Sequence, residues 1–311
     1  MLKRDPKLIV ILGPTASGKS ELAVNLAKKF NGEVISADSR QVYRGLDIGT
    51  GKVPRDKNTR YKVQNTKYYH QGVPHHLLDV VSPKKRFTVV EYRKLAVGAI
   101  DKILKKGKIP ILCGGTGFYI QAVADGIIIP EVPPDWKLRK KLEKKSAKEL
   151  YKILKKLDPR RAKTIEKGNP RRLIRAIEIV MKTKKPVPIF KKNPLPYPVL
   201  MLGIKKSPQE LKKLIEKRLL RWLKTGLISE IKELHLSGLA WKRIKEFGME
   251  YPYVADHIQG KLNYHDMVEL SRKELEHYSK RQMTWFKRDK RIHWVKNYKT
   301  AAKLTRNLLS K

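Results

Sequence analysis

The first 120 residues alternate short apolar runs with amphipathic stretches. Runs at Leu8–Leu12, Glu33–Ala37 and Pro110–Cys113 have the length and composition of buried strands. Stretches at Lys19–Phe30 and Phe87–Lys105 have the length and apolar spacing of helices. Strands that alternate with helices predict a parallel sheet with helices on both faces. Ligands of such sheets bind at the carboxyl ends of the strands, so segments that directly follow a strand are the first candidates for a site.

The middle of the chain has a different pattern, basic and mainly helical. Pro133–Pro134 opens a helical region whose leucines are spaced for one apolar stripe, namely Leu138, Leu142, Leu150, Leu154 and Leu157. A second helix begins at Asn169–Pro170, and a proline-rich connector follows at residues 185–198. Val199–Ile204 then predicts a strand that returns to the sheet, and Ser207–Pro208 opens a helix to about residue 224. We expect a core of residues 1–119 and 198–311 and a helical insertion at residues 120–197.

The segment after the first strand is a phosphate loop. Residues 13–20, GPTASGKS, satisfy the pattern G-x-x-x-x-G-K-[ST] between a strand and a helix. Its backbone N–H groups and the N-terminus of the following helix favour an anion, Lys19 can reach the outer phosphate, and Ser20 can ligate Mg²⁺. The predicted fold is therefore an α/β, P-loop NTPase-like parallel sheet with a mainly helical insertion. The residues predicted to bind the diphosphate or nucleotide are Gly13, Pro14, Thr15, Ala16, Ser17, Gly18, Lys19 and Ser20.

A carboxylate follows the second strand. Asp38 can face the phosphate loop there, where it would hold Mg²⁺ through water or act as a general base. The alternative is a helix N-cap, a frequent role of Asp in this position. Ser39, Arg40 and Gln41 follow as polar groups that can hydrogen-bond the edge of a base.

The charge of the chain favours a polyanionic partner without identifying one. There are 71 Lys and Arg residues against 29 Asp and Glu, a formal net charge of +42. A nucleic-acid partner and a generally lysine-rich proteome both explain this excess. The single cysteine, Cys113, excludes an internal disulfide, and no apolar stretch approaches the roughly 20 residues of a membrane span. We expect a cytoplasmic location and no membrane.

Six segments, in order along nearly the whole chain, resemble the signatures of the tRNA dimethylallyltransferases, also called tRNA isopentenyltransferases. The first two are the phosphate loop and SADSRQVYRGLDIGTGK at residues 36–52. PHHLLD at 74–79 and GGTGFY at 114–119 follow. The last two are NPRRLIRA at 169–176 and YSKRQMTWF at 278–286. The chain resembles the short bacterial members, which lack a zinc finger.

The resemblance implies an activity and roles for particular residues. In this family, N6 of adenine 37 in tRNA attacks C1 of dimethylallyl diphosphate, and diphosphate leaves. Asp38 matches the base and Arg218 matches an arginine placed at the diphosphate, with Mg²⁺ on Ser20. Thr15 lies within the loop and can donate to a phosphate oxygen. Without the resemblance, a solvated arginine on a helix is the better explanation of Arg218.

The resemblance also implies a tRNA anticodon stem-loop as partner. The positions that match family contacts to tRNA are Asp38, Ser39, Arg40, Gln41, Thr116, Arg139, Arg171, Arg172 and Arg175. For the last three a basic helix face is an equally good explanation. For residues 114–117, taken in isolation, an ordinary tight turn is the better explanation. The sequence departs from the family at Arg171, where many members have Gln, and at Met249, where a tyrosine is usual. We expect a monomer.

Three alternatives remain at this stage. The phosphate loop alone also fits an ATP-dependent phosphotransferase of small molecules. Free adenine nucleotides, as in cytokinin-forming relatives, are a second possible acceptor, and a non-enzymatic RNA-binding protein is a third reading of the charge. His75 and His76 lack a third metal ligand at a recognisable spacing, so we expect a loop at the edge of the site. We expect Trp285 and Phe286 to pack their helix on the core.

Overall fold

The structure, a computed structural model, describes residues 5–56, 68–128, 130, 132–189 and 192–310. The chain divides into two compact units, Met1–Gly126 with Pro194–Lys311, and Ile127–Asn193. The second unit begins later than the predicted residue 120 because helix α3 (Gly117–Ala124) belongs to the first unit. Residues 190 and 191 of the predicted connector lie outside the described part.

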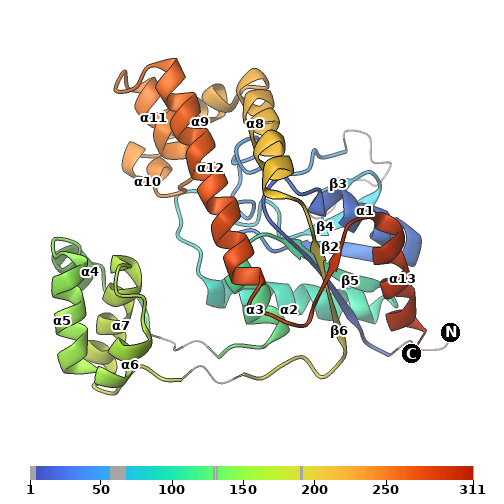
Figure 1. Ribbon diagram of the computed structural model, residues 1–311, viewed down its shortest axis with the longest axis horizontal. Helices are drawn as coiled ribbons and strands as arrows, with labels where there is room; N and C mark the ends of the chain where they lie inside the picture. The colour runs from blue at the N-terminus through green and yellow to red at the C-terminus, as the bar shows by residue number, and fades with distance from the viewer. Residues whose placement is uncertain (1–4, 57–67, 129, 131, 190–191, 311) are drawn as a thin grey trace. The chain divides into compact units, whose positions relative to one another are not determined.

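A seven-stranded sheet forms the centre of the first unit, in the order β3-β4-β2-β5-β1-β6-β7 (Figure 1). Neighbouring strands are parallel except β3 and β4. The carboxyl ends of β2, β5 and β1 lie side by side, so the segments that follow them start at one edge of the sheet. The strands are β1 (Leu8–Leu12), β2 (Gly32–Ser36), β3 (Tyr68–His70), β4 (Val73–His76), β5 (Ile109–Gly114), β6 (Val199–Ile204) and β7 (Ile292–Val295).

Helices cover both faces of this sheet, as predicted. All five residues of β1 are buried, because successive side chains enter opposite layers. Ile9 and Ile11 pack with α1 (Lys19–Phe30) and α13 (Tyr298–Leu309). Val10 and Leu12 join the other layer, which includes α2 (Val89–Lys105) and α3. The sequence therefore gives β1 no polar face, which is the pattern of a central parallel strand.

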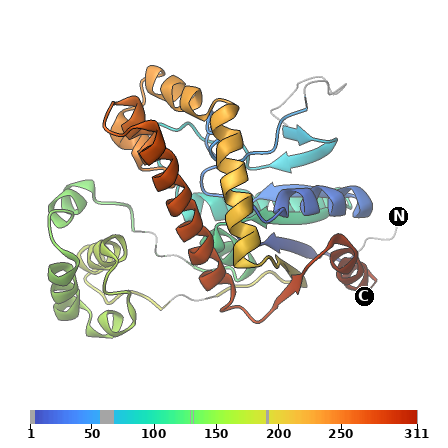
Figure 2. The same cartoon turned by 45° about the horizontal axis from the view of Figure 1, so that its top comes forward.

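The C-terminal part of the first unit is mainly helical. Its helices are α8 (Pro208–Lys224), α9 (Leu227–Leu236), α10 (Trp241–Lys245), α11 (Tyr251–Ile258) and α12 (Tyr264–Phe286). Helices α8 and α12 run side by side in both views (Figures 1 and 2). In the described part of the chain, no helix has the length and apolar character needed to cross a lipid bilayer.

Capping residues set several helix starts. Helix α8 begins at the predicted place because Ser207 and Glu210 form a capping box. Helix α2 begins two residues later than predicted, because Thr88 accepts a hydrogen bond from Glu91 N and caps it. The short strand β7 was not predicted. It pairs with β6 at the edge of the sheet, and its four residues are too few for a clear periodicity.

The second unit is a small helical bundle. Its helices are α4 (Trp136–Leu142), α5 (Ala147–Leu157), α6 (Pro159–Thr164) and α7 (Pro170–Thr183). The predicted stripe is confirmed for Leu142, Leu150 and Leu154, which pack with the apolar face of α7, and Leu138 lies partly buried against them. It is wrong for Leu157, which is 40% exposed at the end of α5.

Candidate active site

The phosphate loop connects β1 with α1, and no side chain of the N-cap residue binds the first-turn amides of α1. Gly18 occupies the N-cap of α1 with φ of 91°, and it has no side chain that could accept a hydrogen bond from the first turn. The first-turn N–H groups of a helix carry a partial positive charge and need external acceptors. This geometry suits a phosphate group.

Two cations lie at this loop without a carboxylate partner. The Nζ atom of Lys19 donates to Pro14 O at 2.6 Å, and Arg218 Nη1 donates to Thr15 Oγ1 at 3.3 Å. Neither side chain forms an ion pair with a carboxylate among the residues that the structure describes. The Arg218 guanidinium lies over the ring of Trp222, 5.7 Å from its centroid. Two positive charges therefore lie beside a helix N-terminus, and a bound anion would neutralise them.

Burial perturbs both cations. It lowers the pKa of Lys19 to about 8, with a further decrease from the charge of Arg218 and opposing increases from Cys113 and Asp38. It also lowers the pKa of Arg218 to about 10, helped by the neighbouring Arg221. Both residues are largely but not fully buried. Titratable groups perturbed in this way by burial and by like charge are characteristic of functional sites.

Asp38 lies close enough to Lys19 to act on its pKa, and it caps a turn. Its Oδ1 atom accepts from Arg40 N at 2.8 Å and from Gln41 N at 3.3 Å. The alternative of a helix N-cap is wrong, because Asp38 caps a turn after β2 and no helix begins there. The second carboxylate oxygen is not used in this cap.

Thr116 binds the Asp38 turn and lies beside Tyr278 of helix α12. Ser39 N donates to Thr116 Oγ1 at 3.0 Å, and Thr116 acts to lower the pKa of Tyr278. Burial, followed by the charge of Asp38, raises the pKa of Tyr278 to about 12. The predicted residues Asp38, Ser39 and Thr116 thus come together with Tyr278, which was in a quoted signature but had no predicted role.

The glycines at 114–117 are required by close packing. A Cβ atom on Gly114 would lie 2.1 Å from Ala37 O, and one on Gly115 would lie 2.3 Å from Gln282 Nε2. On Gly117 it would lie 2.3 Å from a ring carbon of Trp285. The alternative of an ordinary tight turn is wrong, because these glycines allow β2 and α12 to approach β5 and α3 closely.

Gln282 on α12 connects this segment with the phosphate loop. Its Oε1 atom accepts from Thr15 N at 2.7 Å, and its Nε2 atom donates to Gly115 O at 2.9 Å. Gln282 itself is buried, as is Phe286 on the same helix, and Trp285 packs against their cluster. The packing predicted for Trp285 and Phe286 is confirmed.

The side chains of Arg40 and Gln41 are held inside the protein. Arg40 Nη1 forms a buried ion pair with Glu250 Oε1 at 2.9 Å. Gln41 donates to Thr50 O at 3.1 Å and to Gly51 O at 3.3 Å. These contacts fix the loops around Asp38, and the predicted contacts of both side chains with RNA stay predictions.

In the second unit, two predicted RNA-binding arginines share one buried carboxylate. Arg139 donates to both oxygens of Glu178, at 2.8 and 2.7 Å, and Arg175 donates to Oε2 at 2.5 Å. Burial raises the pKa of Glu178, but the hydrogen bonds from the arginines outweigh it and the pKa is lowered. Arg171 and Arg172 are instead exposed on α7. The structure therefore separates two partly internal arginines from two on the surface.

His75 and His76 lie in strand β4, so the predicted loop at the site edge is wrong. His76 Nε2 lies 2.7 Å from Glu33 Oε2, and Lys106 and Lys108 bind the same carboxylate. Burial lowers the pKa of His75 to about 4. No group of three or more His, Cys, Asp or Glu side chains that could hold a metal occurs among the described residues.

The sequence did not single out Glu230, Glu250, Lys52 and Gln282, although all four are buried at or beside the site. The partners of Glu230, Glu250 and Gln282 are remote in the sequence, whereas Lys52 binds partners 5 to 27 positions away. Gln282 and Lys52 had one usable signal, because each lies inside one of the six signature segments.

Fold and site together define the class of this protein. It is a P-loop α/β protein in which Lys19 and Arg218 lie at the phosphate loop without a carboxylate partner among the described residues. A carboxylate, Asp38, follows strand β2, which β5 separates from β1 in the sheet. Residues 41–289 match the family described as IPP transferase, and residues 6–72 match isopentenyl transferase.

Relatives agree over nearly the full chain. The tRNA dimethylallyltransferase of Acetivibrio thermocellus is 36% identical over 311 residues, 97% of this chain and 96% of that protein. The one from Pelotomaculum thermopropionicum is 40% identical over 300 residues, 94% of this chain and 91% of that protein. The chain therefore belongs to the IPP transferase family.

Solved structures agree with this assignment. The full-length tRNA isopentenylpyrophosphate transferase of Bacillus halodurans superposes with a TM-score of 0.69 at 32% identity, covering 98% of this chain and 96% of that one. A eukaryotic dimethylallyltransferase solved acting on tRNA gives a TM-score of 0.70 at 29% identity, covering 90% of this chain and 70% of that one.

Proposed function

We propose that this protein transfers the dimethylallyl group of dimethylallyl diphosphate to N6 of adenine 37 in tRNA and releases diphosphate. The observation that carries the proposal is the pair of cations, Lys19 and Arg218, which lie at the phosphate loop without a carboxylate partner among the described residues. A diphosphate supplies the missing negative charge. The relatives named tRNA dimethylallyltransferase support the choice of reaction.

The chemistry divides between the two sides of the site. As N6 forms a bond to C1 of the donor, the C1–O bond breaks and its electron pair leaves with the diphosphate. Lys19, Arg218 and the loop amides stabilise that charge where it develops. The N6 proton passes to Asp38, whose second oxygen is not used in capping the turn.

Magnesium fits this site as an ion shared with the substrate. Ser20 is the residue of the chain that would hold it, from the first turn of α1. Since the described residues offer no cluster of acidic and histidine ligands, phosphate oxygens and water would complete the shell, the usual arrangement for Mg²⁺. Bound there, the ion would neutralise part of the leaving-group charge.

The second unit is our candidate for much of the tRNA affinity. Residues 127–193 contain 22 Lys and Arg against 7 Asp and Glu, so this unit alone carries a formal +15. Exposed Arg171 and Arg172 can bind phosphates. The adenine leaves its stack in a loop that is already single-stranded, which lowers the cost of extrusion. A cytoplasmic location and a monomeric state remain our predictions.

A comparison of acceptors tests the proposal. The enzyme is incubated with labelled dimethylallyl diphosphate and unmodified tRNA, AMP or ATP, and transfer of label is followed together with phosphate release from ATP. We expect label in tRNA alone. Label in AMP would establish the adenylate alternative, and ATP turnover without RNA would establish the phosphotransferase.

A further inference from the structure

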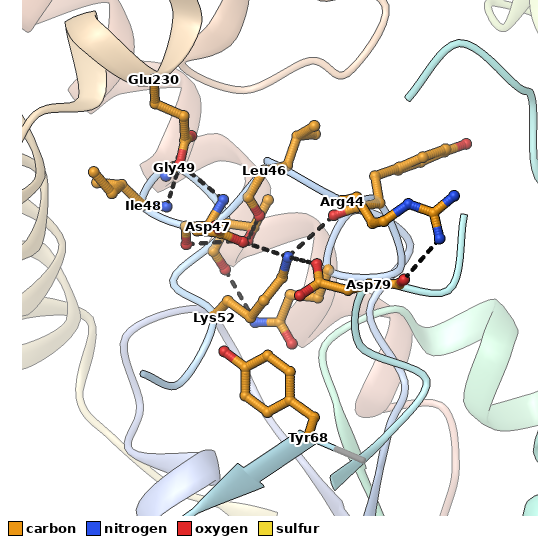
Figure 3. Close-up of polar contacts among 12 residues, drawn as sticks. Arg44, Leu46, Asp47, Ile48, Gly49, Lys52, Tyr68, Asp79 and Glu230 are labelled. Atoms are coloured by element: carbon orange, nitrogen blue, oxygen red, sulfur yellow. Dashed lines mark hydrogen bonds and ion pairs between the residues drawn. The ribbon is translucent and has the colours of Figure 1, made fainter. Parts of the chain in front are cut away.

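A buried carboxylate holds the loop formed by residues 47–52. Glu230, in the first turn of α9, accepts from Asp47 N at 2.8 Å and from Ile48 N at 2.5 Å through Oε2 (Figure 3). Its Oε1 atom accepts from Gly49 N at 3.2 Å and from the Tyr251 hydroxyl at 2.9 Å. Four donors thus converge on one side chain that is 9% exposed. Such charge-assisted hydrogen bonds are stronger than those between neutral groups.

Lys52 secures the other end of the same loop. Its Nζ atom donates to Tyr43 O at 3.0 Å and to Asp47 Oδ1 at 2.6 Å, and it also pairs with Asp79 (Figure 3). The Lys52 side chain is 1% exposed. Movement of the loop is costly, because freeing either buried charge would leave it unpaired in the interior.

This loop sets the environment of Arg218. A Cβ atom on Gly51 would lie 3.1 Å from the Trp222 ring and 3.7 Å from Arg218 Nη1. Since Arg218 has no carboxylate partner among the described residues, packing against Gly51 and Trp222 and the bond to Thr15 determine its position.

The same network reaches Asp38 from the opposite direction. Tyr251, which binds Glu230, lies under the Arg40 guanidinium, 5.8 Å from its ring centroid. Arg40 is paired with Glu250, and Arg40 N donates to Asp38 Oδ1. Hydrogen bonds and one cation–π contact therefore connect the turn of the proposed base with Glu230 and the 47–52 loop.

We propose that Glu230 is a positioning residue that sets the place of Arg218 relative to Asp38 through the 47–52 loop. The inference rests on the proposed function, because it concerns the alignment of the leaving diphosphate with the base. Both carboxylate oxygens of Glu230 are used by donors of the protein itself. It acts by fixing the loop against which Arg218 packs.

Glu230→Gln tests this role with little change in side-chain size. It replaces one acceptor oxygen by an NH₂ group that faces two donors. We expect kcat/KM for dimethylallyl diphosphate to fall about 100-fold, the effect of a displacement of roughly 1 Å at a reacting centre, while the Kd for tRNA is unchanged. Glu233→Gln, on the exposed side of the same helix, is the matched control and should alter neither value.

A double-mutant cycle separates positioning from general damage. In an Arg218→Ala background, Glu230→Gln should lower single-turnover rates far less than it does in the wild type, because the group it places is gone. Equal losses in both backgrounds, or an unchanged kcat/KM in Glu230→Gln, overturn the proposal.

A second variant covers the case in which Glu230→Gln does not fold. Tyr251→Phe removes one donor and leaves the three backbone donors, so it should give a smaller loss with the same dependence on Arg218. If Tyr251→Phe lowers the single-turnover rate equally in the wild-type and Arg218→Ala backgrounds, the positioning role of Glu230 is again refuted. Wild-type transfer to tRNA is measured first. If the wild type transfers no dimethylallyl group to tRNA, the proposed function is refuted. If transfer occurs but the cycle shows equal losses in both backgrounds, only the role of Glu230 is refuted.

Discussion

Lys19 gives the site a predictable dependence on pH. Burial lowers its pKa to about 8, and a bound diphosphate would raise the pKa again because it favours the charged amine. Binding therefore takes up a proton when the free amine is neutral, so donor affinity is highest below about pH 8 and declines above it. Arg218, with a pKa of about 10, keeps its charge through this range.

The size of the effect follows from the titration curve. With a pKa of about 8, the protonated fraction of Lys19 falls from about 0.9 at pH 7 to about 0.1 at pH 9, so affinity should fall about tenfold. Calorimetry with a non-hydrolysable thiolodiphosphate analogue of the donor, without tRNA, measures this directly.

A control variant isolates the lysine. Lys19→Met should bind the analogue more weakly at pH 7 and show little further change up to pH 9. If wild-type affinity is flat between pH 7 and pH 9, then Lys19 does not bind the diphosphate in the way the loop geometry implies. The same slope in Lys19→Met would assign the titration to another group.

Further variants test other parts of the site. Asp38→Asn keeps the oxygen that caps the turn but removes the base, so kcat should fall by about 10² to 10⁴ with unchanged tRNA affinity; near-native kcat would exclude the assigned role. Gly115→Ala places a Cβ 2.3 Å from a side-chain nitrogen of α12 and should destabilise the fold by about 1–3 kcal/mol in thermal unfolding. Gly98→Ala, inside α2 with open space around it, should stabilise the fold by about 0.5–1 kcal/mol. If Gly98→Ala and Gly115→Ala change the stability equally, the packing argument for Gly115 is contradicted. Arg171→Ala with Arg172→Ala should weaken tRNA binding and reduce its salt dependence by a slope of about 2, whereas an unchanged slope would remove both from the interface.

The sequence predicted elements best where its signals are local. Strand Leu8–Leu12, helix Lys19–Phe30 and the helix after Ser207 agree with the structure, because apolar period and capping are properties of neighbouring residues. Leu157 and β7 were not predicted correctly. The first lies at a helix end beyond the packed stripe, and the second depends on pairing with a strand far away along the chain.

The sequence motifs identified residues of the candidate site, but they did not predict the contacts between those residues. Signatures placed Asp38, Thr116 and the phosphate loop at one sheet edge, which the register of the strands explains. They could not assign partners, because Gln282 binds Thr15 across 267 positions and Glu230 binds Gly49 across 181. Contacts of this kind depend on tertiary packing and leave no period in the sequence.

Burial separates the two explanations for the positive charge of the chain. A lysine in solvent needs no partner, so the total of +42 does not by itself distinguish a nucleic-acid partner from a lysine-rich proteome. Inside the protein, charges are normally compensated, as Glu178 is by Arg139 and Arg175. Lys19 and Arg218 are the exception at the phosphate loop, since burial lowers the pKa of each while neither has a carboxylate partner among the described residues. Two largely buried cations that lie close together repel each other unless an anion neutralises them. Lys19 and Arg218 therefore indicate a diphosphate more directly than the net charge of the chain does.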